Sequence, residues 1–385
     1  MESLKSMKKL QGLINSQGTF FENHFVSTPI CCPSRSSILT GRYVHNNLAK
    51  NNSISGNCAS QFWYDRNENS TIGVLLKNAG YTTLYAGKYL NQYGDESTGG
   101  TSHVPPGWDW WYGLISPTSS TYFYDYKMSV NGTLVKHGHK IDDYLQLVIG
   151  NVSMEFIEYR KADKSPFFMF LAPTASHYPY TPLPQHKTNF SSERVPRTPD
   201  FNHHATDKHW LLRQTPKSLP KSVIDGADEE YRGRWRSLLA VDDMIEDLVQ
   251  KLEESGMLQN TYIIFSSDNG FHLGQLCLPS DKRQMYEFDV RVPLAVRGPS
   301  VKPQVRHQPT ISLDLMPTVL DYAGIDPLPD WLDGLSMRPL LDSRERFAKL
   351  AKTVPNRILG RRGTTRSRRL SKYSRRIRMR IGLHL

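Results

Sequence analysis

Short apolar runs alternate with amphipathic stretches along most of the chain. Continuous apolar runs at residues 166–171 and 262–265 predict strands that are covered on both faces, and three weaker runs predict further strands at 19–26, 81–86 and 292–296. Apolar residues at helical spacing predict helices over 6–15, 71–78, 141–159, 229–254 and 315–322. This alternation indicates an α/β fold with a mostly parallel sheet, right-handed crossovers and flanking helices.

Polar residues follow three of these strands. Lys88, His177 and the pair Asp268-Asn269 each come just after an apolar run. Ligands bind outside the carboxyl ends of strands in open α/β sheets, so we expect these side chains to meet in one site. Residues 91–140, which contain many Gly, Ser and Trp residues, are expected to form an irregular excursion and not regular core.

Residues 31–42, Cys-Cys-Pro-Ser-Arg-Ser-Ser-Ile-Leu-Thr-Gly-Arg, predict a reactive group at the start of a helix. Pro33 suits a first helical position, and Gly41 suits the end of the helix. The free N–H groups and the dipole would then favour an anion at Cys31. Arg35 adds a planar, permanently charged fork that matches a tetrahedral oxyanion.

The pattern Cys-x-Pro-Ser-Arg followed by Leu-Thr-Gly-Arg resembles the signature of the type I, formylglycine-dependent sulfatases. The resemblance covers about residues 11–341 and implies an alkaline phosphatase/sulfatase-like fold. It implies that a formylglycine-generating enzyme oxidises Cys31 to formylglycine (3-oxoalanine), whose hydrate attacks sulfur, while Cys32 fills a variable position. The alternative interpretation is two buried cysteines, or half of a disulfide, beside a helix start.

Four further residues carry roles that the resemblance implies for sulfate chemistry. Lys88, in a Gly-Lys pair, and Lys282, in the segment 281–293, would contact the sulfate. With Arg35 they would spread the developing negative charge. His177, in a Pro-x-x-x-His-x-Pro setting, or Lys282 would protonate the leaving alcohol.

The resemblance also implies a calcium site, formed by Asp268 and Asn269 together with the oxidised Cys31. Calcium takes six to eight oxygen ligands. Family members supply two more Asp from a first strand before the signature, yet no Asp precedes Asp65 in this sequence. We therefore expect that this strand is missing and that the chain as given is inactive.

Two residues are candidate substrate ligands. The form Lys88-Tyr89-Leu90-Asn91 is similar to the glucosamine-6-sulfatase branch, where Leu90 replaces a His that many members carry, and Asn91 is a candidate in its place. His272, within residues 270–275, is the second candidate. The implied substrate is 6-O-sulfated N-acetylglucosamine in sulfated glycosaminoglycans such as heparan or keratan sulfate.

Three alternatives remain open at this stage. An endo-acting heparan 6-O-sulfatase would remove the same group from internal units. A catalytically inactive homologue would only bind sulfated glycans. A related metal phosphohydrolase would normally carry Thr or Ser at position 31, so Cys31 speaks against it.

The charge of the chain is concentrated at its C-terminal end. Residues 344–385 contain 15 Lys or Arg and one Glu, so their formal charge of +14 exceeds the +11 of the whole chain and leaves the rest at −3. We expect residues 1–341 to form the catalytic domain and residues 342–385 a basic, disordered tail where a smaller antiparallel domain would stand. We expect no specific nucleic-acid partner.

Compartment signals in the sequence are mixed. Sequons at Asn51, Asn69, Asn131, Asn151 and Asn189 favour a glycoprotein, lysosomal or secreted in its complete form. No apolar segment after Met1 forms a signal peptide, and no run approaches the length of a membrane span. A bridge between Cys58 and Cys277 is possible, although spacing alone cannot establish it.

Overall fold

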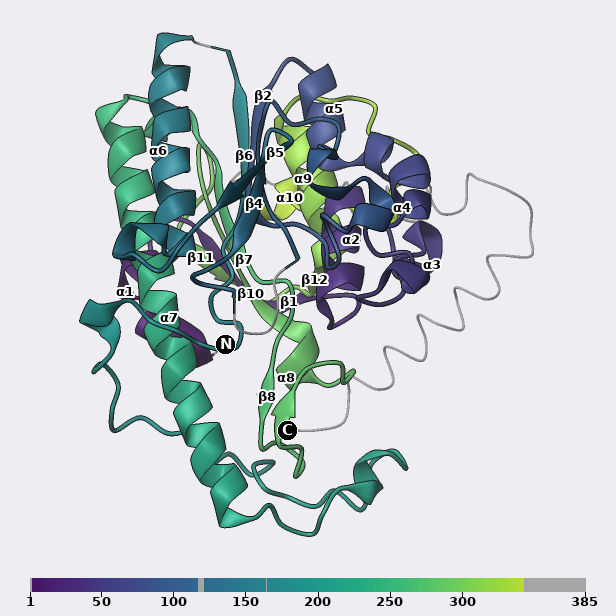
Figure 1. The fold of residues 1–385 in the computed structure, drawn as a ribbon, viewed down its shortest axis with the longest axis vertical. Coiled ribbons are helices and arrows are strands. Elements are labelled where there is room, and N and C mark those ends of the chain that lie inside the picture. Colours follow the sequence, from purple (N-terminus) through teal and green to yellow (C-terminus); the bar gives the residue numbers. More distant parts are fainter. Residues whose placement is uncertain (1, 117–120, 164, 343–385) are drawn as a thin grey trace.

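Two mixed sheets occupy the centre of the molecule, with helices on either side (Figure 1). The computed structural model describes residues 2–116, 121–163 and 165–342. The α/β prediction is confirmed, but the sheets are mixed and not mostly parallel. The predicted tail, apart from Asp342, lies outside the described residues.

The first sheet has the order β11-β1-β10-β7, with β12 also paired to β1. Its strands are β1 (Thr19–Phe25), β7 (Ile263–Ser266), β10 (Arg291–Arg297), β11 (Gln304–Arg306) and β12 (Thr310–Ile311). The central pairs β1–β10 and β10–β7 are antiparallel, whereas β11 and β12 run parallel to β1.

The second sheet has the order β5-β4-β3-β2-β6. Its strands are β2 (Thr82–Lys88), β3 (Trp110–Leu114), β4 (Lys127–Val130), β5 (Thr133–Lys136) and β6 (Phe167–Ala172). β2 is parallel to β3 and β6, while β3–β4 and β4–β5 are antiparallel. The prediction that residues 91–140 are irregular is therefore wrong, because Trp111 and Met128 bury their side chains in the core.

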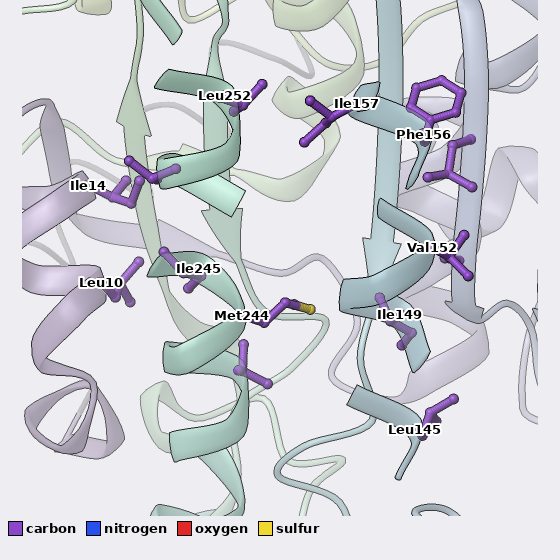
Figure 2. Close-up of a cluster of buried hydrophobic side chains, with 14 of the residues drawn as sticks. Leu10, Ile14, Leu145, Ile149, Val152, Phe156, Ile157, Met244, Ile245 and Leu252 are labelled. Carbon is purple, nitrogen blue, oxygen red and sulfur yellow. The ribbon is translucent and has the colours of Figure 1, made fainter. Parts of the chain in front are cut away.

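One helical layer is built on α6 (Leu145–Ala162) and α7 (Lys221–Glu254). The N-terminal segment packs beside α7 as a short helix α1 (Lys8–Leu10), which is continued by a π-helical turn over Gln11–Asn15. Figure 2 shows Leu10 and Ile14 beside Ile245 of α7, and Met244 directed toward α6. This apolar cluster is one of the two main clusters of the core among the described residues.

The opposite layer contains α2 (Cys31–Thr40), α5 (Ile72–Asn78) and α9 (Leu315–Tyr322), as Figure 1 shows. These helices pack on an aromatic cluster that includes Tyr85 and Trp111. The remaining short helices are α3 (Val44–Asn47), α4 (Gln61–Arg66), α8 (Glu287–Val290) and α10 (Arg338–Leu341), and a hairpin joins β8 (His272–Leu273) to β9 (Ser280–Asp281).

A cavity of about 1640 Å³ lies between the two sheets and is lined by all of β6 and β7. Among the described residues, β6 pairs only with β2 and β7 only with β10, so each presents an unpaired edge. The sequence predicts that both strands are covered on both faces, yet most of their residues are only half-buried, because they border this cavity. The cavity continues to Cys31, Lys88, His177 and Asp268.

Candidate active site

Cys31 is the first residue of α2 and is 2% exposed. Ile30 precedes the helix in an extended conformation, and Gly41 ends it with a left-handed φ of 61°. Pro33 is therefore the third helical residue and not the first. The predicted helix and its end are confirmed, and Cys31 stands where backbone N–H groups and the helix dipole favour negative charge.

The Cys31 thiol is surrounded by cations. Lys282 Nζ donates a hydrogen bond to Cys31 Sγ over 3.2 Å. Burial alone would raise the pKa of this thiol, but the charges of Lys88 and Lys282 and a hydrogen bond from His177 lower the pKa well below its ordinary value. The site therefore stabilises negative charge at position 31.

Arg35 links two of the converging strands. Its Nε donates to Asp268 Oδ2 over 2.8 Å, and its Nη1 donates to the carbonyl of Lys88 over 2.8 Å. Burial opposes ionisation of Asp268, yet the charges of Arg35, Lys282 and Lys88 hold the pKa of this carboxyl well below its usual range. Arg35 thus holds Asp268 and the end of β2 in place, and its charge also interacts with the Cys31 thiol.

Lys88 is placed by the glycine before it. Gly87 has a φ of 112°, and a Cβ there would lie 2.2 Å from the carbonyl oxygen of Ala172 on β6. Only glycine lets β2 approach β6 this closely in this backbone conformation. Lys88 is the last residue of β2 and 5% exposed, and its ammonium lies 5.4 Å from the centre of the Tyr122 ring.

His177 lies in the loop that follows β6, and its ring stacks on Tyr122 with centroids 4.1 Å apart. Its Nδ1 lies 2.8 Å from the carbonyl oxygen of Tyr178. Because a carbonyl only accepts, Nδ1 carries the hydrogen, which leaves Nε2 for proton exchange at Cys31.

Asp268 and Asn269 follow β7 as predicted, but they do not form a complete calcium site. Asn269 Oδ1 is buried without a hydrogen-bond partner among the described residues, which suits a metal ligand. Asp268, however, is already paired with Arg35. The described residues contain no group of three or more His, Cys, Asp or Glu that could hold a metal ion, whereas calcium takes six to eight oxygens.

The two predicted substrate ligands have different positions. Asn91 lines the cavity, and its Oδ1 is buried without a partner among the described residues. His272 does not line the cavity; it is 2% exposed, and its Nδ1 lies 2.9 Å from Asp289 Oδ1. The structure therefore gives His272 a buried structural role, which corrects the prediction for this residue.

The disulfide joins Cys32 to Cys58, so the suggested Cys58–Cys277 bridge is wrong. The two remaining cysteines, Cys31 and Cys277, are free and buried. This pairing ties the start of α2 to the loop before α4. It also leaves Cys31 as a free thiol beside the cation cluster.

Sequence reasoning missed two residues of the site. Tyr122 supports both His177 and Lys88, but it lies in the stretch expected to be irregular. Asn52 accepts a hydrogen bond from the Cys32 N–H through its Oδ1 over 2.9 Å and lines the cavity. Neither residue has a local sequence signal, because both positions depend on how distant loops fold onto α2.

All five sequon asparagines are exposed. No helix in the described ranges is both long and apolar enough to cross a membrane.

Comparison with known sequences gives consistent matches. The family model described as Sulfatase matches residues 2–325. The chain is 46% identical over 338 residues to N-acetylglucosamine-6-sulfatase of Homo sapiens, a match that covers 87% of this chain and 60% of that protein. It is 38% identical over 352 residues to a putative extracellular sulfatase Sulf-1 homolog of Caenorhabditis elegans, which covers 90% of this chain and 48% of that protein. The chain thus spans about half to three fifths of the length of these relatives.

Solved structures share the fold. A protein in complex with its substrate D-glucosamine-2-N,6-O-disulfate superimposes with a TM-score of 0.72 at 24% identity, and the match covers 88% of this chain and 75% of that chain. A phosphonate monoester hydrolase from Silicibacter pomeroyi gives a TM-score of 0.67 at 20% identity, covering 89% of this chain and 73% of that chain. At these identities the likeness shows the fold alone.

Proposed function

Because the chain belongs to the sulfatase family, we propose that its site hydrolyses the 6-O-sulfate ester of N-acetylglucosamine units in glycosaminoglycans. The observation that carries this proposal is the cation cluster around Cys31, with Lys282 Nζ at 3.2 Å from Sγ and the charge of Lys88 acting on the same thiol. Such a cluster suits a sulfate group with developing negative charge at this point.

Each residue of the site has a separate role in the proposed reaction. A formylglycine hydrate at position 31 would supply the attacking hydroxyl. The ammonium groups of Lys88 and Lys282 would contact the sulfate oxygens and stabilise the negative charge that develops on them in the transition state. His177 keeps Nε2 available to hold a proton beside the leaving alcohol. Arg35 fixes Asp268 and the end of β2.

Calcium stays a prediction of the resemblance. Asp268 and Asn269 would supply two ligand side chains, and the described residues do not complete the set. The glycan specificity and a lysosomal or secreted location rest on the relatives named N-acetylglucosamine-6-sulfatase and extracellular sulfatase, and on the five exposed sequon asparagines.

An endo-acting sulfatase is the second candidate, because the similarity to the extracellular sulfatase covers 90% of this chain. The two candidates differ in where sulfate is released. A chain-end enzyme releases it from N-acetylglucosamine 6-sulfate, whereas an endo-acting enzyme releases it only from internal units of long heparan chains.

The test is co-expression of the full chain with the formylglycine-generating enzyme. Mass spectrometry should show the aldehyde on Cys31. Sulfate should be released from N-acetylglucosamine 6-sulfate in the presence of calcium, a result that would also contradict the expectation, drawn from the absence of an Asp before Asp65, that the chain as given is inactive. Cys31→Ala should abolish release, while Cys277→Ala, which removes the other free thiol, should retain it. Release that survives Cys31→Ala, or no release by a protein that carries the aldehyde, would overturn the proposal.

A further inference from the structure

Three side chains beside the reacting centre take no part in the sulfate chemistry described above. Glu230 and Arg234 lie one turn apart on α7, so they share one face of the helix. Both line the same cavity as Cys31, and so does Tyr178. We call these three residues the α7 patch.

Arg234 is held between the two loops that carry His177 and Asp268. Its Nη1 donates to the carbonyl of Ser176 over 2.9 Å, and its guanidinium lies 4.2 Å from the centre of the Phe271 ring. Stacking on a ring leaves the in-plane N–H groups of a guanidinium pointing outward at its edges. Ser176 and Tyr180 each take a hydrogen bond from Arg234, and its remaining N–H groups are donors in one plane beside the sulfate site.

Glu230 has hydrogen-bonding capacity that the protein does not use. Its Oε2 is buried without a hydrogen-bond partner among the described residues. Burial raises the pKa of this carboxyl, although a hydrogen bond with Ser280 and the charge of Arg234 oppose the rise. Buried polar atoms in folded proteins are nearly always paired, so an unpaired carboxyl oxygen at a cavity wall indicates a ligand.

Tyr178 adds an aromatic surface to this wall. It directly follows His177 and is 54% exposed although it borders the cavity, and its ring meets Tyr180 edge-to-face with centroids 5.7 Å apart. An exposed ring can pack against the apolar C–H face of a pyranose, while polar neighbours pair with its hydroxyls.

We propose that the α7 patch binds the sugar ring that carries the sulfate, by pairing Glu230 and Arg234 with its hydroxyl and amide groups and packing Tyr178 on its apolar face. This inference rests on the proposed function, since it names the part of the site that receives the sugar of the same ester. The planar fork of Arg234 suits the carbonyl oxygen of an acetamide. The free oxygen of Glu230 suits a hydroxyl.

The test compares two ligands on the full chain before Cys31 is converted, so that binding is measured without turnover. Isothermal titration gives the dissociation constants of methyl sulfate and of N-acetylglucosamine 6-sulfate, which are both monoanionic esters. The first constant divided by the second reports what the sugar adds to the affinity. Glu230→Leu and Arg234→Lys should each reduce this ratio about three- to tenfold, the effect of one lost hydrogen bond. Glu253→Leu, an exposed position of α7, is the matched control and should leave the ratio unchanged.

A wild-type ratio near one, or an unchanged ratio in Glu230→Leu and Arg234→Lys with wild-type unfolding temperatures, would overturn the inference. An equal loss of affinity for both ligands would overturn the inference as well, because such a loss would show that these residues bind the sulfate group and not the sugar. The outcome is separate from that of the proposed function. If the variants change the ratio as expected but the aldehyde-bearing enzyme releases no sulfate, the proposed hydrolysis is contradicted and the proposed sugar binding is not.

Discussion

Replacing Lys282 by Met tests the electrostatics of the site in the unconverted protein. The change removes an ammonium that lies 3.2 Å from Cys31 Sγ and keeps a side chain of similar length. Two unit charges at that separation interact by about 5 kcal/mol at an effective dielectric constant of 20. Lys88 remains and water can enter the cavity, so we expect about half of this, roughly 2 to 3 kcal/mol. That energy corresponds to a loss of about 30- to 150-fold in the ionisation constant of the thiol.

The assay is the rate of Cys31 alkylation by iodoacetamide as a function of pH, measured by mass spectrometry of the modified peptide. Only the thiolate reacts, so the midpoint of the profile reports the pKa of the thiol. In the wild type the midpoint should lie well below the ordinary value of about 8.5, and Lys282→Met should move it upward. Cys277 is an internal reference, because burial raises the pKa of that thiol.

Two control variants make the result decisive. Lys302→Met removes an exposed lysine and should leave the profile unchanged. Asp268→Asn removes an anion that opposes the thiolate and should move the midpoint downward. A Lys282→Met profile that overlays the wild type, or an equal shift in Lys302→Met, would refute a local ion pair between Lys282 and Cys31.

Three further predictions concern stability. Cys58→Ala removes the Cys32–Cys58 disulfide, whose sequence separation is 26, and should lower the free energy of unfolding by about 3.5 kcal/mol in urea titrations. Adding reductant should not lower the free energy of unfolding of this variant any further. Gly87→Ala should lower the free energy of unfolding by more than about 2 kcal/mol, because the new Cβ would lie 2.2 Å from a carbonyl oxygen of β6. The control Gly226→Ala on α7, where a Cβ has no neighbour within 4 Å, should leave the free energy of unfolding unchanged or raise it. Burial lowers the pKa of His24 to about 3, from an unfolded value near 6.5. Unfolding therefore takes up a proton below pH 6.5, and the stability lost as the pH falls from 7 to 5 should be about 2 kcal/mol, measured by urea unfolding and absent in His24→Gln.

The convergence of Lys88, His177 and Asp268 could be predicted from the strand pattern of the sequence. Cys31 is assigned from a helix start and the resemblance, and Lys282 from the resemblance alone. Most of these residues follow an apolar strand or begin a helix, and such signals are local. One general rule about the carboxyl ends of strands then brings the strand-end residues together. In the structure all five side chains line one cavity.

Other features depend on packing between distant segments. Cys32 could pair with any cysteine that the fold brings close, and only the folded loop before α4 selects Cys58. In the sequence His272 is a candidate ligand only because residues 270–275 resemble the family, and the sequence does not indicate that the buried carboxylate of Asp289 binds its ring. The sequence does not predict β3 to β5, because Gly and polar residues interrupt their apolar pattern. These strands are held by pairing in the sheet, β3 with β2, β4 with β3 and β5 with β4.

The unpaired edges of β6 and β7 also bear on self-association of the protein. An unpaired strand edge is a template for another chain, and in the described part of the chain two such edges border one cavity. An extended apolar segment from a neighbouring molecule can pair with either edge, which favours self-association at high concentration. A polypeptide segment that pairs with β6 and β7 would cover both unpaired edges. Such a segment would therefore also reduce aggregation of the protein.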